Sequence, residues 1–85
     1  FMAYKRLTKL IREKTQRKET IETKVLNLYE ASNPSLYYVY EVLGDYYAAI
    51  QQIDTAITYW QKALTMPIPK QAEKVRIQQK INKNQ

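Results

Sequence analysis

One stretch of the chain, residues 40–63, limits the possible folds more than any other. Aromatic, leucine and small residues recur there every three or four positions, in two separate runs. The runs are Tyr40, Leu43, Gly44 and Tyr47, and then Ala56, Trp60 and Ala63. Because residues three and four apart share one face of a helix, each run predicts one helix with a single packing face. A short turn between the helices makes them antiparallel, and their two faces then meet.

Gly44 is the only glycine in the chain and lies inside the first predicted helix. A glycine in a helix costs about 1 kcal/mol relative to alanine, so we expect close packing against it as compensation. A phosphate-binding loop is the alternative role, but such a loop needs further glycines, and the chain has none. We expect Tyr40, Tyr47 and Trp60 to fill the space around the small residues.

The order of these residues resembles the tetratricopeptide repeat (TPR), whose pattern is aromatic-x2-Leu-Gly-x2-Tyr, then Ala-x3-aromatic, then Pro. Pro67 and Pro69 supply the last element. The resemblance implies a helix–turn–helix unit over residues 37–70, in a right-handed superhelical stack of such units. The family often has glycine in the turn between the helices, where this chain has Gln51 and Gln52. Asp54 is expected to cap the second helix.

The segment before residue 37 repeats the same frame in a weaker form. Tyr4, Leu7 and Ile11 have the spacing of the first run, with Thr8 in place of the glycine. We therefore interpret residues 1–36 as a degenerate repeat. The buried residues predicted for its second helix are Ile21, Val25, Leu26, Leu28 and Tyr29.

Residues 71–85 follow the prolines and are predicted to form a capping helix with one face on the preceding repeat. Its apolar members are Ala72, Val75, Ile77 and Ile81. The whole chain is thus predicted to be a single all-α domain of about five helices. It consists of antiparallel hairpins stacked as a short TPR-like superhelix.

Composition argues against catalysis in these 85 residues. Histidine and cysteine are absent from the sequence, which removes the commonest general base, nucleophiles and transition-metal ligands. Glu41 and Asp45 lie four apart on one predicted helix, where we expect them to be solvated. The sequence therefore predicts no enzyme, no cofactor and no metal site. No apolar run approaches the length of about 18 residues that a membrane span needs.

Charge is unevenly distributed along the chain, which has a net charge of +6. Residues 1–19 carry seven basic and two acidic side chains, and residues 70–85 carry five basic and one acidic. The middle, residues 20–69, carries two basic and five acidic side chains. Basic ends suit phosphate contacts, so a nucleic-acid-binding helical domain is one alternative. Against it, no nucleic-acid motif is present and the tyrosine cluster lies in the acidic middle.

The resemblance to the TPR family also suggests a binding surface, because the first helix of each hairpin lines a concave groove there. The residues it places in this groove are Lys5, Lys9, Arg12, Tyr38, Glu41, Asp45, Ala48, Ala72, Val75 and Gln79. We expect Lys5 and Lys9 to form exposed ion pairs with Glu41 and Asp45. Tyr38 or Tyr46 is expected either to contact a partner or to pack against adjacent helices.

The predicted function is a protein–protein interaction or assembly module that binds a peptide, a helix or a neighbouring domain. About three repeats are normally needed for a stable stack, and this chain offers two and a half. The domain is therefore expected to belong to a longer chain, or to cover its open N-terminal edge by self-association. A further alternative, suggested by Phe1 in place of methionine, is the helical C-terminal tail of a larger enzyme.

Overall fold

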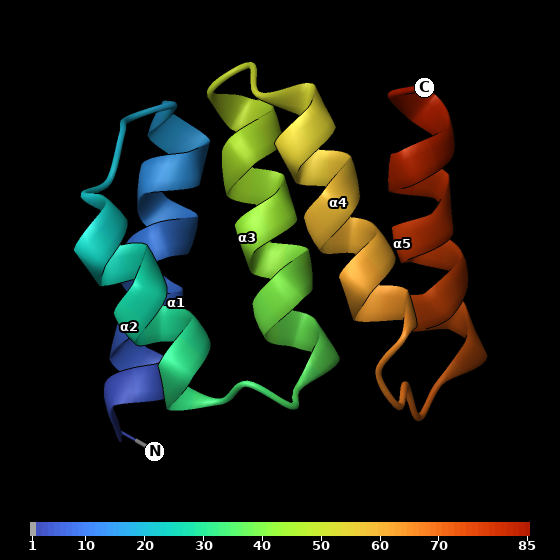
Figure 1. Ribbon diagram of the computed structural model, residues 1–85, viewed down its shortest axis with the longest axis horizontal. Coiled ribbons are helices and arrows are strands. Elements are labelled where there is room, and N and C mark those ends of the chain that lie inside the picture. Colours follow the sequence, from blue (N-terminus) through green and yellow to red (C-terminus); the bar gives the residue numbers. More distant parts are fainter. Residues whose placement is uncertain (1) are drawn as a thin grey trace.

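The computed structural model describes residues 2–85, apart from the side chain of Met2, and contains five α-helices. They are α1 (Met2–Arg17), α2 (Thr23–Ser32), α3 (Tyr37–Ala49), α4 (Ile53–Leu64) and α5 (Gln71–Lys83), as Figure 1 shows. No strand occurs within residues 2–85, so the prediction of an all-α fold with five helices is confirmed. Phe1 lies outside the described residues.

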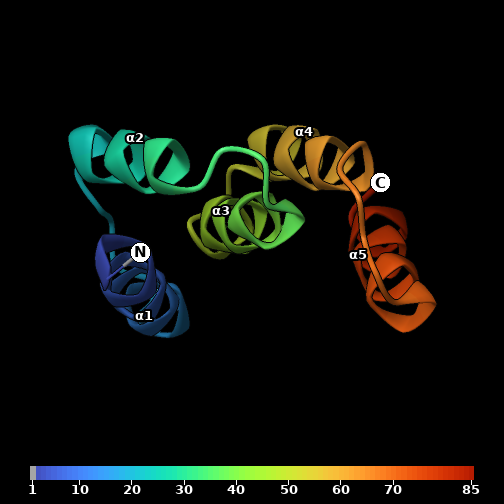
Figure 2. The ribbon, with the colours of Figure 1, turned by 90° about the horizontal axis from the view of Figure 1, so that it is seen from below.

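Consecutive helices run antiparallel, and α1 packs directly on α3, which joins the two hairpins. Seen end-on in Figure 2, α2 and α4 lie on one side of the molecule, and α1 and α5 lie on the other, with α3 between them. The inner side of this arc is lined by α1, α3 and α5. The molecule is a thin plate with extents of 28 × 28 × 17 Å.

Helix α3 is the centre of the core. Six consecutive residues, from Val39 to Gly44, are buried, because α3 packs against α1, α2 and α4 on different sides. A helix that is apolar nearly all round is typical of such a central position. The exception in this run is Glu41, a carboxylate with only 2% of its surface exposed.

Gly44 of α3 lies directly against the indole ring of Trp60 on α4. A Cβ atom built on Gly44 would lie 2.4 Å from Cδ1 and from Nε1 of the Trp60 indole. Real Cβ atoms do not approach other atoms this closely, so only glycine fits without displacing the ring. Ala56 and Ala63, on α4, are fully buried, and Trp60 is almost so. The hairpin α3–α4 is therefore closed by small residues against one large ring.

The tyrosines are mostly packing residues. Tyr46 is buried, and its hydroxyl accepts a hydrogen bond from the backbone N–H of Ile21 at 2.9 Å. Of the two tyrosines expected either to contact a partner or to pack between helices, Tyr46 packs between helices, whereas Tyr38 is half-buried and stays a candidate for a partner contact. Tyr47 is half-buried and stacks on Tyr59 of α4, with ring centroids 5.4 Å apart. Tyr37 is also buried.

Two turns end their helices with the same geometry. In the turn after α3, Gln52 N donates to Tyr47 O at 2.9 Å and Gln51 N donates to Ala48 O at 3.1 Å. This hydrogen-bond pair is the Schellman motif, which places the residue after the C-cap in the left-handed region. Gln51 accordingly has φ 68°, and Lys18, in the equivalent turn after α1, has φ 57°. Neither position holds the glycine that such turns favour.

Four local predictions need correction. Ile21, predicted to be buried in the second helix, is half-buried and precedes α2, which begins at Thr23. Asp54 is not the N-cap of α4, because the helix begins at Ile53 after Gln52, and Asp54 lies in its first turn. An acidic side chain in the first turn still stabilises the helix, because it lies near the positive end of the helix dipole. Leu28 was predicted to be buried but is 61% exposed, and Val25 is only half-buried. Leu26 and Tyr29 are the fully packed residues of α2, because only one narrow side of this short helix meets α1 and α3.

Candidate functional site

The concave side of the molecule, formed by α1, α3 and α5, contains three shallow cavities of about 330, 200 and 260 Å³. The first is lined by Lys5, Thr8, Lys9, Arg12, Glu13 and Gln16 of α1. The second lies between α1 and α3 and is lined by Arg12, Thr15, Gln16, Val42 and Asp45. The third reaches α5 and is lined by Arg12, Tyr38, Glu41, Asp45, Arg76 and Lys80. Arg12 lines all three cavities, so they adjoin one another along the α1 side.

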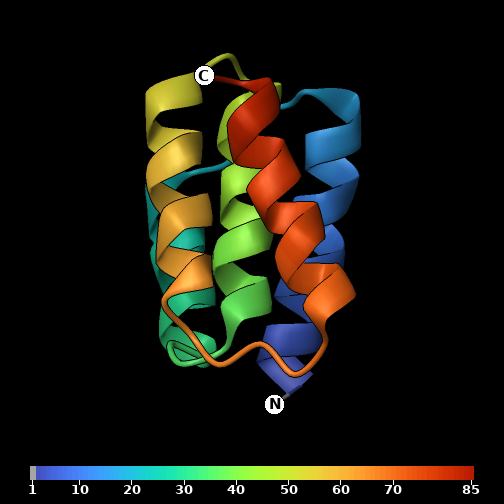
Figure 3. The same cartoon turned by 90° about the vertical axis from the view of Figure 1, so that its right-hand side faces the viewer.

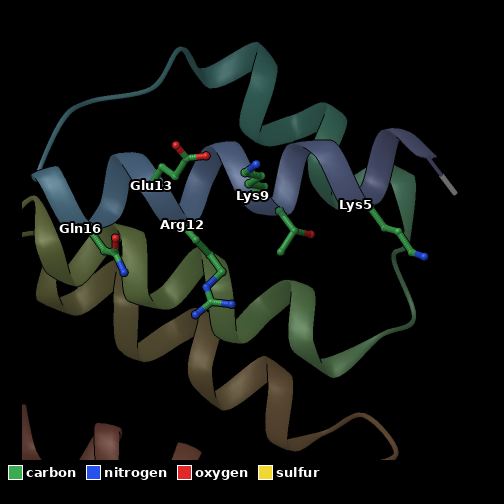
Figure 4. A pocket seen from close by; sticks show the side chains of 6 residues that line it. Lys5, Lys9, Arg12, Glu13 and Gln16 are labelled. Atoms are coloured by element: carbon green, nitrogen blue, oxygen red, sulfur yellow. The ribbon is translucent and has the colours of Figure 1, made fainter.

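The α1 wall of this surface is basic. Figure 4 shows Lys5, Arg12 and Gln16 extending from α1 toward α3, while Glu13 points away from that helix. Within residues 2–85, none of the cations Lys5, Lys9 and Arg12 forms an ion pair. The prediction that Lys5 and Lys9 pair with Glu41 and Asp45 is therefore wrong.

The carboxylates of α3 pair with α5 instead. Arg76 donates two hydrogen bonds to Glu41, from Nε at 2.8 Å and from a terminal nitrogen at 2.7 Å. Lys80 Nζ donates to Glu41 Oε2 at 2.7 Å and to both oxygens of Asp45 at 3.0 Å. Glu41 and Asp45 are four residues apart on one helix, as are Arg76 and Lys80 on the other, so the two pairs match in spacing. The prediction that the carboxylates are solvated surface is wrong for Glu41.

The surroundings of the two carboxylates shift their pKa values in opposite directions. Burial raises the pKa of Glu41, but the hydrogen bonds from Arg76 and Lys80 outweigh it and leave the pKa below its ordinary value of 4.5. Burial also raises the pKa of Asp45, and the charge and hydrogen bonds of Lys80 offset only part of this effect. The indole Nε1 of Trp60 also donates to Asp45, at 3.1 Å. Glu41 is thus a stable anion, whereas Asp45 binds its proton more readily.

A second polar link joins α3 to α5 next to this network. The hydroxyl of Tyr37 donates a hydrogen bond to the carboxylate of Glu73. Burial, followed by this hydrogen bond, raises the pKa of Tyr37 to about 12. Tyr37 therefore stays protonated at neutral pH and keeps the hydrogen that it donates to Glu73.

The structure brings together most of the residues predicted for the groove, but not those of α5. Lys5, Lys9 and Arg12 line the cavities, and so do Tyr38, Glu41 and Asp45. Ala48 is half-buried and lines none of the three cavities. Ala72, Val75 and Gln79 are exposed and line none of them either.

Arg76 and Lys80 are the α5 residues that face the concave side, and sequence reasoning missed them. The matched four-residue spacing of the cations and the carboxylates is present in the sequence, but Lys70 and Lys74 have the same spacing, so it does not identify the pair by itself. Ile77 and Ile81, which are buried, directly follow Arg76 and Lys80. Burying the isoleucines thus turns the cations toward α3.

Within residues 2–85 there is no group of three or more Asp and Glu side chains that could hold a metal ion. Over the same residues, no helix has both the length and the apolar character that crossing a bilayer requires. The chemistry on this face is that of charge pairing and hydrogen bonding.

Comparison with known proteins adds no relative of this chain: no family model matches it, and no curated protein or solved structure is significantly similar.

Proposed function

We propose that this chain is a protein–protein interaction module of the TPR type, which binds an acidic, extended segment of a partner on its concave face. The observation that carries the proposal is the position of Arg12. This side chain lines all three cavities, is exposed, and has no ion-pair partner within residues 2–85. A cation placed at the junction of three cavities is suited to a carboxylate.

The distribution of charge over the concave face supports an acidic ligand. On the α5 side, the cations and carboxylates neutralise each other in the network of Glu41, Asp45, Arg76 and Lys80. On the α1 side, Lys5, Lys9 and Arg12 outnumber the single carboxylate of Glu13. A ligand that passes over this wall therefore gains most from negative charge, which also speeds its association.

The hairpin packing described above supports the TPR part of the proposal. Gly44 packed against Trp60, with Ala56 and Ala63 buried behind it, is the arrangement that the repeat pattern implies. The arc in Figure 2, whose inner side is lined by α1, α3 and α5 while α2 and α4 lie on the outer side, is typical of stacked hairpins with a concave surface.

The proposal is tested by selecting binders from a random peptide library with the full chain. We expect the selected peptides to be rich in Asp and Glu. The triple variant Lys5→Gln, Lys9→Gln, Arg12→Gln is expected to bind them at least about tenfold more weakly, a difference of about 1.4 kcal/mol. The matched control is Lys70→Gln, Lys74→Gln, Lys83→Gln, which removes three exposed cations that line none of the cavities.

Equal losses in the triple variant and in its control would show attraction to net charge alone and would contradict the concave site. A salt titration distinguishes peptide binding from the alternative function, nucleic-acid binding. Binding of a single-stranded oligonucleotide that falls steeply with salt, and more strongly than peptide binding does, would favour that alternative.

A further inference from the structure

Helix α5 is held by few apolar contacts. Only two of its side chains, Ile77 and Ile81, are buried, and its backbone packs beside α4. Figure 3, seen from the α5 side, shows α5 inclined to α4. Helix α3 buries eight residues and α5 only two, so the apolar contacts of α5 are weak compared with those of α3.

The contacts from α5 to α3 are polar. They are the Tyr37–Glu73 hydrogen bond and the ion pairs of Arg76 and Lys80 with Glu41 and Asp45. Glu41 is the only charged residue that is buried in the part of the chain described, and both of its cations come from α5. The surface beneath α5 thus has the chemistry of a binding site for a basic helix, with a desolvated carboxylate at its centre.

We propose that α5 is a releasable latch on an acidic seat, formed by Glu41 and Asp45 of α3, and that a basic helix of a partner protein displaces α5 from this seat. The displacing helix carries two cations four residues apart, each followed by an isoleucine or leucine, as Arg76-Ile77 and Lys80-Ile81 do. The argument for this occupant is charge complementarity, because α5 itself demonstrates which side chains satisfy Glu41 and Asp45. The acidic seat belongs to the third cavity, which Arg12 also lines, so this inference concerns another part of the proposed face. Its variants leave Lys5, Lys9 and Arg12 unchanged, so it can fail while the proposed function holds.

A change in salt concentration can weaken the attachment of α5. The side chains of Arg76 and Lys80 are 46% and 28% exposed, so salt can screen them from the outside. The tethered helix competes with a partner at an effective concentration in the millimolar range. A partner helix must therefore bind more tightly than α5, or act when the latch is weakened.

The first experiment weakens the latch in the full chain with Arg76→Gln and Lys80→Gln. The probe is a fluorescein-labelled peptide of residues 70–85, and its anisotropy reports binding. We expect this double variant to bind the peptide at least about tenfold more tightly than the wild-type chain, whose seat is occupied. A control peptide with the same two substitutions is expected to bind about tenfold more weakly than the native peptide.

Adding Glu41→Gln and Asp45→Asn to the double variant removes the seat and is expected to abolish peptide binding. Equal binding of both peptides to the folded double variant, or binding of neither, overturns the proposal. Dimerisation of that variant in light scattering without peptide binding assigns the seat to a second copy and overturns it as well.

A second measurement on the wild-type chain keeps the inference testable if the double variant does not fold. Amide hydrogen exchange of α5 is expected to be about tenfold faster than that of α3, because local opening follows local stability. Raising NaCl from about 0.05 to about 0.5 M shortens the screening length and should accelerate exchange in α5 alone. Equal protection of α5 and α3 at both salt concentrations overturns the latch.

Discussion

Gly44 and Trp60 show how one residue without a side chain decides the packing of a hairpin. The indole is almost fully buried, and its Nε1 is held by Asp45, so the ring has little freedom to move. The cost of a glycine within α3 is offset because no other residue allows the two helices to approach this closely.

We expect Gly44→Ala to destabilise the chain by up to about 2 kcal/mol. The added methyl clashes with Trp60 at a cost of about 1–3 kcal/mol, and better helix propensity returns about 1 kcal/mol. Urea unfolding followed by circular dichroism measures the change. In a Trp60→Phe background the smaller ring makes room, so the same substitution should cost less. A Gly44→Ala variant more stable than wild type would contradict the packing described.

Lys18 and Gln51 hold left-handed positions where an L-residue is strained. The left-handed conformation costs roughly 1–2 kcal/mol for a residue with a Cβ, and glycine loses about 0.5–1 kcal/mol through its greater freedom when unfolded. We therefore expect Lys18→Gly and Gln51→Gly each to stabilise the chain by about 0.5–1 kcal/mol in urea unfolding. Gln52, with φ −103°, is the matched control, and Gln52→Gly should destabilise. Loss of stability in both turn variants would rule out strain there.

Among the elements, α5 differs from the others because ion pairs provide much of its attachment. Its free energy of docking therefore depends on the ionisation of Glu41. The folded-state pKa of Glu41 lies below 4.5, so its stabilising effect is complete above that pH and is lost as the pH falls through the lowered value. The folded-state pKa of Asp45 is raised, so its contribution to stability is instead lost as the pH rises through that pKa.

We expect Glu41→Gln to destabilise the chain at pH 7 by about 1.5–3 kcal/mol, the range for hydrogen bonds to charged groups. The difference from wild type should shrink as the pH falls below 4.5, because the wild-type carboxylate then becomes neutral as well. Urea unfolding at a series of pH values measures it. The control is Glu22→Gln, whose exposed pairing with Lys24 contributes little. A difference that stays constant down to pH 3 would mean that the charge of Glu41 is not what stabilises the fold.

Helix positions could be predicted from the sequence, whereas the rotation of α5 could not. Apolar periodicity and the prolines at 34, 67 and 69 locate helices to within a few residues. On α5, however, Val75 and Ile77 are two positions apart, which places them about 200° apart around the helix axis. The two apolar stripes of α5 are thus equally available to local reasoning, and the carboxylates of α3 select the one with Ile77. Buried Glu41 was missed for the same reason, because its partners lie more than thirty positions away in the chain.

At the scale of the whole molecule, the hairpins form one structure because α2 packs on α3, Glu30 of α2 pairs with Lys62 of α4, and two further contacts join α1 and its turn to α3. Helix α1 packs on α3, with Ile11 fully buried, and the turn between α1 and α2 is tied to α3 through Tyr46. The second contact is a single hydrogen bond, from the N–H of Ile21 to the Tyr46 hydroxyl. Cooperative unfolding of both hairpins depends on these contacts, because each hairpin alone buries little surface.

The Tyr46→Phe variant tests this coupling, with Trp60, the only tryptophan, as a reporter in the second hairpin. Losing the partner of the Ile21 N–H should cost about 1 kcal/mol. If the hairpins unfold together, Trp60 fluorescence shows a lower urea midpoint with an unchanged slope, because the slope follows the surface exposed on unfolding. The control is Tyr59→Phe. The hydroxyl of Tyr59 makes no hydrogen bond within residues 2–85, so its removal should leave the urea midpoint unchanged. A smaller dependence of the unfolding free energy on urea in Tyr46→Phe would contradict cooperative unfolding. It would mean that the hairpin containing Trp60 unfolds separately once this hydrogen bond is lost.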